Sequence, residues 1–334
     1  MSFMNNLLTT ILLLFSSVAL LYGQTKSDHK EVLLLMGSRF EFTANADTEA
    51  QAKTAVGAGI EEVKRIESLI SSWDSLSQTS EVNRNAGIRA IKVDLELFEL
   101  ISRAIKISEL TDGAFDISFA GIDWLYTFDK SEQSLPSKEQ RLKSIEKIDY
   151  RQIELNRNDT TVFLKTKDSK IGFGGIGKGY AANRSMQIMK EMTGIKGGLV
   201  NASGDLIAWG DNGKSDQWKI QISNPEDINQ TFGWLELKDM SIVTSGDYER
   251  YFTHDDIRYA HIINPRTGLP TTGIKSVSII SPDAEIGDAL ATSVFVLGRE
   301  KGLDLIDGLK NIEALIIDDQ NEIHYSKNLK LNEE

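Results

Sequence analysis

Segments with the two-residue hydrophobic period of a strand alternate along this chain with segments that have the period of a helix. In residues 39–44 (RFEFTA), Phe40 and Phe42 fall on one face of an expected strand, and residues 48–70 carry apolar side chains at helical spacing. A second helix is expected to begin after Asp94, a good N-cap, and to end near Gly113. The mixed order favours an α+β or α/β enzyme core.

The same alternation continues toward the C-terminal end. Residues 130–147 are polar, and we expect them to form an insertion or a surface helix. Ser281 and Pro282 are expected to open a helix, as its N-cap and its first residue. The remaining expected elements are a glycine-rich segment with its helix at 172–192, strands at 198–208, 218–222, 234–237 and 277–280, a loop that reaches residue 268, and a hairpin at 313–327.

The N-terminal residues differ from the rest of the chain. Residues 7–21 (LLTTILLLFSSVALL) carry no charge, and as a helix they would span roughly 22 Å, less than the hydrocarbon core of about 30 Å. They therefore predict a signal peptide over residues 1–23, which leaves 24–334 as the mature chain. An uncleaved anchor is the alternative, because no Lys or Arg precedes the apolar run. Cysteine is absent, so the sequence offers neither a lipidation site nor a disulfide.

The charge balance limits the possible ligands. A formal net charge of −12 and no cluster of Lys and Arg disfavour a nucleic-acid partner. Any bound polyphosphate must therefore be held locally, by backbone amides, a lysine or a metal ion.

The glycine-rich segment IGFGGIGKGYAANR is the first candidate for such a site. Gly172, Gly174 and Gly177 satisfy G-x-G-x-x-G, but the acidic residue of a dinucleotide-binding fold cannot be placed about 20 positions later. Lys178 is followed by Gly179, where a P-loop needs Ser or Thr. What remains is a backbone that a ligand can approach, and helix N-terminal amides that suit a pyrophosphate. A turn required only for packing is the alternative.

Two further segments carry candidate functional groups. Asp288 and Thr292 are four residues apart on an expected helix, so both oxygens can reach one ion, and such ligands suit Mg²⁺. A solvated or capping role is the alternative. His261 precedes a segment with the composition of a turn and is a candidate general base, or else a structural histidine.

Together these segments resemble the ApbE family of FAD:protein FMN transferases. The family's motifs match, in order, residues 172–181 (GFGGIGKGYA), 201–205 (NASGD), 244–251 (TSGDYERY), 261–268 (HIINPRTG) and 287–293 (GDALATS). The N-terminal half agrees at residues 36–38 (MGS), 73 (W), 80–83 (SEVN) and 113–116 (GAFD). The resemblance covers nearly all of the mature chain. It therefore implies one catalytic unit: an α+β, T-fold-like arrangement of mixed sheets and packed helices with FAD in a central cleft.

The resemblance also implies roles for individual residues. Mg²⁺ would be held by Asp288, Thr292 and the backbone carbonyl of Gly175. The FAD site would include Met36, Trp73, Ala114, Phe115, Asp116, Gly172, Lys178 and His261. The rings of Trp73 and Phe115 suit the flavin or adenine planes.

This chain departs from the family pattern at two positions. Gly172 stands where the family has an acidic residue, which removes one expected FAD contact. Ser203 stands where a glycine is usual, and we expect it to be a tolerated substitution within a strand.

The implied reaction is attack by a Thr or Ser hydroxyl of a partner protein on the FMN-side phosphorus of FAD, with release of AMP. Mg²⁺ and Lys178 would offset the growing charge, and His261 would take the proton, with Asp247 and Asp116 as the next candidates for the base. The alternatives are a pyrophosphatase that gives FMN and AMP, an exported flavin-binding protein without turnover, and a redox flavoenzyme. The resemblance implies as partner an exported or membrane electron-transfer subunit with an acceptor motif of Ser, Thr, Gly and Ala. It places the enzyme in the periplasm or on the outer face of the cytoplasmic membrane.

Overall fold

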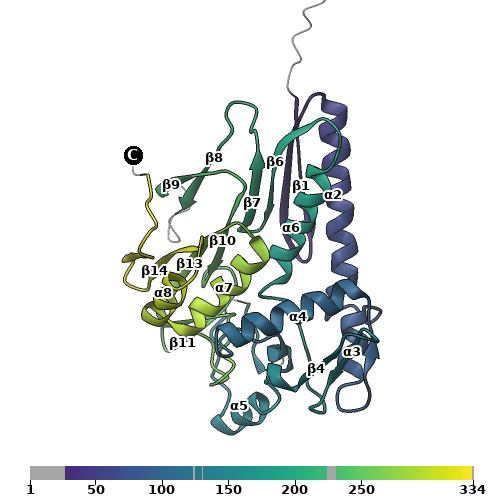
Figure 1. The fold of residues 1–334 in the computed structure, drawn as a ribbon. Coiled ribbons are helices and arrows are strands. Elements are labelled where there is room, and N and C mark those ends of the chain that lie inside the picture. The colour runs from purple at the N-terminus through teal and green to yellow at the C-terminus, as the bar shows by residue number, and fades with distance from the viewer. Residues whose placement is uncertain (1–26, 123–124, 130, 224–230, 333–334) are drawn as a thin grey trace, which may run out of the picture.

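An eight-stranded antiparallel sheet forms the centre of the computed structural model, which describes residues 27–334 except 123–124, 130, 224–230 and 333–334 (Figure 1). From one edge to the other its strands are β1 (Ser27–Leu35), β2 (Ser38–Ala46), β6 (Ile195–Ala202), β7 (Asp205–Gly210), β10 (Met240–Gly246), β13 (Ile274–Ser281), β14 (Glu313–Asp318) and β15 (Ile323–Tyr325). All neighbouring strands are antiparallel. The mixed architecture confirms the predicted α+β class, while the central FAD cleft stays a prediction.

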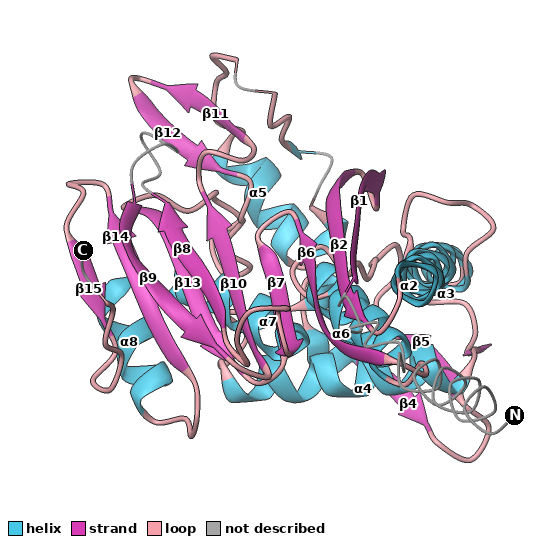
Figure 2. Ribbon diagram, turned by 90° about the horizontal axis from the view of Figure 1, so that it is seen from above, coloured by secondary structure: helices cyan, strands magenta, loops and turns pink. Residues whose placement is uncertain are grey.

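Helices cover one face of this sheet (Figure 2). Helix α2 (Glu49–Ile70) packs on β1 and β2, α6 (Gly177–Lys190) on β6 and β7, and α7 (Ala284–Leu297) on β10 and β13; α8 (Arg299–Asp307) packs on β14. Helix α2 begins after Thr48, whose side chain accepts a hydrogen bond from Gln51 N. Its buried stripe includes Val56, Val63 and Ile66, as the helical spacing predicted.

A β-hairpin covers part of the opposite face. Strands β8 (Trp218–Ser223) and β9 (Thr231–Leu237) place Leu235 and Leu237 against Leu206 of β7 and Ile242 of β10. The sheet therefore has an apolar layer on both sides, and this explains why β7 is almost continuously hydrophobic instead of alternating.

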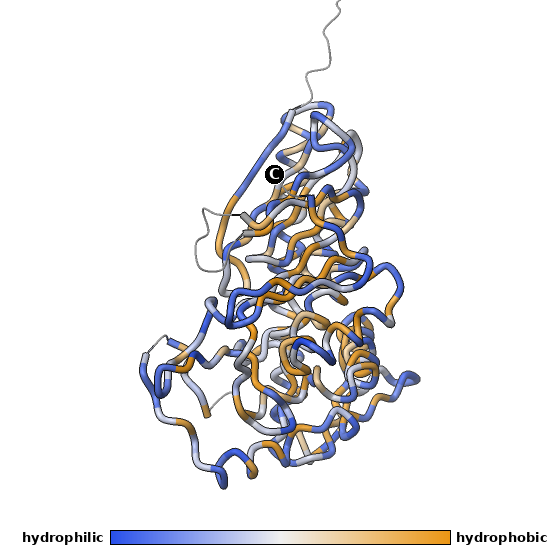
Figure 3. The backbone as a smooth tube through the Cα atoms, turned by 90° about the vertical axis from the view of Figure 1, so that its left-hand side faces the viewer, coloured by the Kyte–Doolittle hydropathy of each residue, from blue (hydrophilic) through white to orange (hydrophobic). Residues whose placement is uncertain are grey.

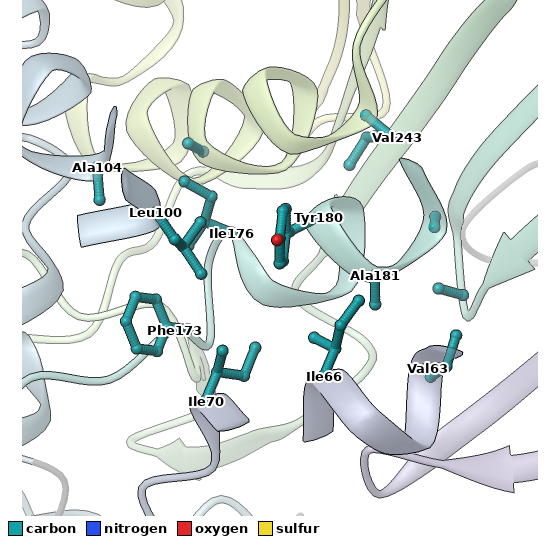
Figure 4. Packing of buried hydrophobic residues seen from close by; sticks show 14 of the residues in the cluster. Val63, Ile66, Ile70, Leu100, Ala104, Phe173, Ile176, Tyr180, Ala181 and Val243 are labelled. Atoms are coloured by element: carbon teal, nitrogen blue, oxygen red, sulfur yellow. The ribbon is translucent and has the colours of Figure 1, made fainter. Parts of the chain in front are cut away.

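The chain between α2 and α6 builds a second layer beside one end of the sheet. It contains α3 (Gln78–Arg84), β3 (Ile91–Lys92), α4 (Leu95–Leu110), the 3₁₀ helices η1 (Ile117–Gly121) and η3 (Tyr150–Gln152), β4 (Ile153–Asn156) and β5 (Thr161–Leu164). Leu100 of α4 and Ile70 of α2 meet Phe173 and Ile176, which immediately precede α6 (Figure 4). The main core thus continues beneath the glycine-rich segment.

A separate aromatic cluster lies under the hairpin of β11 (Tyr251–His254) and β12 (Ile257–Ala260). The ring of Phe252 stacks on Tyr126 with centroids 5.9 Å apart and on Tyr259 at 5.2 Å. The nearby α5 (Lys138–Ile145) starts with a capping box, and it is the surface helix predicted within residues 130–147.

Three expectations about local structure were wrong. Ser281 ends β13, and Asp283 is the N-cap of α7, accepting a hydrogen bond from Ile286 N at 3.1 Å. Residues 198–208 belong to two strands, with Ser203 in the turn between them. The expected loop that reaches residue 268 contains β10, β11 and β12. Met36 and Gly37 form the two-residue turn between β1 and β2.

The hydropathy of the backbone follows this layering, with apolar segments inside and polar segments outside (Figure 3). Among the residues that the structure describes, no helix is both long and apolar enough to cross a membrane. The predicted signal peptide, residues 1–23, lies outside the described residues.

Candidate active site

The glycine-rich segment is anchored at its start by a side chain from α3. The amide of Asn83 donates to Ile171 O at 2.9 Å, and its carbonyl oxygen accepts from Ile171 N at 2.8 Å. The chain then turns, with Gly177 N donating to Phe173 O at 2.7 Å, and enters α6. The N-cap Ile176 makes no side-chain cap hydrogen bond. The positive end of the α6 dipole thus faces a site that can attract anions.

Helix α7 lies very close to this end of α6. A Cβ atom at Gly179 would be 2.1 Å from Ala284 O, and one at Gly175 would be 2.8 Å from Thr292 Oγ1. Gly179 N donates to Asp288 Oδ2 at 3.1 Å. Glycine is therefore required at position 179 for the two backbones to approach, and a side chain at position 175 would displace Thr292.

This close approach brings together the residues predicted to hold Mg²⁺. Asp288 and Thr292 lie one turn apart on α7, and Gly175 lies beside Thr292. Asp288 is 3% exposed, and its burial raises its pKa well above the usual range, with a further contribution from Asp205. A carboxylate, a hydroxyl and a backbone carbonyl are the hard oxygen ligands that Mg²⁺ takes, so the residues present fit the ion.

Lys178 joins this group through an ion pair that sequence reasoning did not predict. Its Nζ donates to Asp205 Oδ2 at 3.0 Å. Burial opposes the charged ammonium, but Asp205 and Asp288 together raise the pKa of Lys178. Burial raises the pKa of Asp205, which also shares a hydrogen bond with the carboxyl of Asp288. In the sequence, only the position of Asp205 at the end of the motif 201–205 pointed to a role for this residue.

Glu249 is a third carboxyl close to Lys178, and sequence reasoning missed it as well. Burial raises the pKa of Glu249 to about 7; Lys178 opposes this shift and Asp205 adds to it. The residue lies within the motif at 244–251, at a position where the family pattern specifies no residue type. The pattern therefore gave no signal for it.

His261 follows β12 and is held by the backbone of Arg250. Its backbone N donates to Arg250 O at 2.9 Å, and its Nδ1 lies 3.3 Å from the same oxygen. A hydrogen bond from Nδ1–H to that carbonyl leaves Nε2 as the basic nitrogen. Burial, with smaller contributions from the charges of Arg250 and Lys178, lowers the pKa of His261 to about 4. The imidazole is thus neutral at pH 7, as a proton acceptor must be.

The two other candidates for the base are engaged in the fold. Asp247 accepts from Arg258 Nη1 at 3.1 Å. Asp116 caps η1 by accepting from Ser118 N and Oγ, and its other oxygen accepts from Tyr150 N at 2.9 Å. Burial raises the pKa of Asp116, and these hydrogen bonds oppose the shift.

The predicted FAD residues occupy different environments. Met36 has φ +50° in the β1–β2 turn, and its Cε would lie 3.6 Å from a Cβ at Gly177. Trp73 is 85% exposed, whereas Ala114 and Phe115 are almost fully buried, with Phe115 in the main core. The ring of Phe115 is therefore covered in this structure and cannot stack on a ligand without moving.

Phe119 is a partly exposed aromatic residue that sequence reasoning missed. Its Cζ would lie 3.4 Å from a Cβ at Gly174, so the ring sits directly over the glycine-rich segment. Gly172 is buried, and a Cβ there would lie 3.0 Å from Ala120 Cβ. An acidic side chain at position 172 therefore requires a shift of η1, which accounts sterically for the glycine.

Comparison with known proteins gives one consistent result. The chain matches the model of the ApbE family over residues 36–316. The FAD:protein FMN transferase of Treponema pallidum (strain Nichols) is 31% identical over 281 residues, which cover 78% of this chain and 77% of that protein. The FAD:protein FMN transferase of Klebsiella pneumoniae (strain 342) is 29% identical over 300 residues, covering 89% and 92%.

Solved structures agree with the sequence relatives. The crystal structure of the ApbE protein from Thermotoga maritima has a TM-score of 0.81 at 30% identity, covering 90% of this chain and 97% of that chain. The flavin transferase ApbE from Vibrio cholerae has a TM-score of 0.79 at 22% identity, with 90% and 98% covered, and this likeness supports the fold alone.

Proposed function

Because this chain belongs to the ApbE family, we propose that it is an FAD:protein FMN transferase, which moves FMN from FAD to a hydroxyl of a partner protein and releases AMP. The proposal rests mainly on the close approach of two helices, α6 and α7. The N-terminus of α6, with Lys178, faces Asp288 and Thr292 on α7 across a contact that only glycine allows. This arrangement suits a diphosphate bound with a divalent cation.

Asp288, Thr292 and the carbonyl of Gly175 would hold Mg²⁺. When bound, the ion supplies charge neutralisation at the phosphate oxygens. Lys178 contributes a positive charge at the same place, and the amides at the start of α6 contribute partial positive charges. These groups orient the diphosphate and stabilise the charge that develops on it.

The proton of the acceptor hydroxyl goes to His261. As the hydroxyl oxygen bonds to the FMN-side phosphorus, the bond from that phosphorus to the AMP oxygen breaks, and Nε2 takes the proton. A neutral imidazole whose Nδ1 faces the carbonyl of Arg250 has the right tautomer for this step. The low pKa makes His261 a weak base, but it keeps nearly all of the molecules in the competent form at pH 7.

We propose that the acceptor is an exported or membrane-bound electron-transfer subunit with a Ser- or Thr-containing motif, and that this enzyme meets it outside the cytoplasmic membrane. The proposal is supported by the uncharged run at residues 7–21, which is typical of a signal peptide.

The test combines the mature protein with FAD, Mg²⁺ and a panel of exported FMN-binding domains. Intact mass measures FMN attached to the acceptor, and chromatography measures AMP. The expected result is one FMN per acceptor with an equal amount of AMP. Asp288→Ala should abolish both, because a lost ligand removes the ion that neutralises the diphosphate. Asp304→Ala, which removes an exposed carboxylate on α8, is the matched control and should behave as wild type.

The same assay separates the other functions. Free FMN with AMP and an unmodified acceptor would identify a pyrophosphatase. FAD that stays bound and intact would identify a flavin carrier, and FAD that is reduced by an electron donor without cleavage would identify a redox flavoenzyme. Normal turnover by Asp288→Ala would refute the metal assignment.

A further inference from the structure

We propose that Asp205 is a positioning residue of the transfer reaction, which fixes the ammonium of Lys178 beside the metal-binding carboxylate of Asp288. The inference rests on the proposed function. It assigns a role to a residue that the family resemblance leaves without one.

Asp205 stands on a rigid part of the fold. It is the first residue of β7, directly after a tight turn in which Ser203 has φ +56° and Gly204 has φ +106°. Gly204 N donates to Asn201 Oδ1 at 2.9 Å, and Gly204 O accepts from Thr244 N at 3.1 Å. The backbone of Asp205 is therefore fixed by β6 on one side and by β10 on the other.

Asp205 and Lys178 differ in the exposure of their side chains, and this difference indicates the role of each. The side chain of Asp205 is 1% exposed, whereas that of Lys178 is 23% exposed, with 3.0 Å between Nζ and Oδ2. The side chain of Lys178 is therefore the more accessible of the two, and the carboxylate of Asp205 is covered. An ammonium has three hydrogen-bond donors, so Lys178 can hold Asp205 and a phosphate oxygen together. Asp205 acts through Lys178 and does not touch the substrate itself.

Lys178 needs such an anchor because two other carboxyls compete for it. Asp288 and Glu249 both interact electrostatically with the ammonium. A flexible lysine that is released from Asp205 would move toward one of them. Pairing with Asp288 would neutralise a carboxylate that must bind the metal. Asp205 therefore keeps the cationic side chain and the metal ligand as separate groups.

The test is a double-mutant cycle with Asp205→Asn, Lys178→Met and the double variant. AMP release is measured at varied FAD concentration, since it reports cleavage whether the phosphorus goes to a hydroxyl or to water. Asp205→Asn should lower kcat by roughly 10- to 100-fold, the usual effect of a misplaced group, with less than about a three-fold change in KM for FAD. In the Lys178→Met background, the same substitution should have no further effect on kcat.

A purely structural role predicts a different pattern. Asp318 serves as the control, because it is also a covered carboxylate in an ion pair, 2.7 Å from His324 and 3.4 Å from Arg299. Asp318→Asn should lower stability and leave kcat unchanged. If Asp205→Asn behaves in that way, or if its effect multiplies with that of Lys178→Met, the inference is wrong.

Two provisions keep the outcome decisive. If Asp205→Asn does not fold, Asp205→Glu keeps the charge but moves the ammonium, and it should lower kcat only where Lys178 is present. Wild-type AMP release without FMN on the acceptor would refute the proposed transferase activity and still allow the cycle to be measured. An inactive wild type would refute both.

Discussion

Gly179→Ala tests the contact on which the candidate site depends. A methyl group at this position would lie 2.1 Å from Ala284 O and 2.6 Å from Ala284 C, where ordinary contact begins near 3.4 Å. Both of these atoms belong to the backbone of α7, so no side-chain rotation can relieve the overlap. The two helices must separate, and this movement also weakens the hydrogen bond from Gly179 N to Asp288.

The expected loss of stability follows from three contributions. Overpacking of this kind costs about 1–3 kcal/mol. A lost hydrogen bond to a charged group costs about 1.5–3 kcal/mol. Alanine is a better helix former than glycine, and this difference stabilises the variant by about 1 kcal/mol. We therefore expect Gly179→Ala to lower the free energy of unfolding by about 1.5–5 kcal/mol. We also expect a higher Mg²⁺ concentration for half-maximal AMP release, because Asp288 moves away from Gly175.

Gly57→Ala is the matched control, since Gly57 lies in α2 and a Cβ there meets nothing within 4 Å. This substitution should stabilise the protein by about 0.5–1 kcal/mol and leave the Mg²⁺ dependence unchanged. Urea unfolding, with the m-value of each variant measured, compares the free energies of unfolding of Gly179→Ala and Gly57→Ala. Equal stability of the two variants would refute the argument that glycine is needed for the α6–α7 contact.

Three further substitutions test other parts of the site. Ser203→Gly should raise the free energy of unfolding in urea by about 0.5–1 kcal/mol, because the φ of +56° strains a serine but not a glycine; a loss of stability would contradict this. Glu249 has a pKa of about 7 in the fold against the usual 4.5, so its contribution to stability is complete below 4.5 and is lost as pH rises through 7. In metal-free urea titrations at pH 5 and pH 8, Glu249→Gln should remove that loss, and an unchanged pH dependence would exclude the effect. His261→Asn should slow AMP release about 10²- to 10⁴-fold with FAD affinity nearly unchanged. The wild-type rate should fall at pH near 4, where His261 becomes charged. Equal losses of binding and turnover would make His261 a binding residue.

The sequence predicted those parts of the fold and site that depend on local patterns. The spacing of Asp288 and Thr292 was enough to place both on one helix face, and residues 48–70 form the expected helix. Family motifs were needed to place Gly175 beside them. Strands β11 and β12 were missed because their sequences, YFTH and IRYA, are only four residues long and too short to show a clear alternation. Their stability comes from Phe252 and the aromatic cluster below, which no local pattern shows.

The errors at single residues have the same physical origin. Ser203 was expected in a strand because the motif at residues 201–205 was assigned to one, and only the pairing of β6 with β7 reveals a turn there. Phe115 was expected to stack on FAD because of its aromatic ring, but this ring is buried in the main core. Phe119 remains partly exposed over Gly174. Phe115 precedes the N-cap of η1 and Phe119 lies within η1, so the burial of each ring depends on how this short segment packs on the core, which no local pattern shows.

The charges assembled around Lys178 support the proposal that a divalent cation binds there. Asp205, Asp288 and Glu249 surround a single ammonium, and the pKa of each carboxyl is raised, chiefly by burial. The metal-free site therefore tends to retain protons instead of carrying its full negative charge. Each phosphate of an incoming FAD adds a further negative charge, which makes full ionisation still less favourable. A divalent cation on Asp288 reverses this balance, because it stabilises the ionised carboxylate and the diphosphate together. Loss of protons from the carboxyls, binding of the ion and binding of FAD should consequently be coupled, and each should strengthen the others.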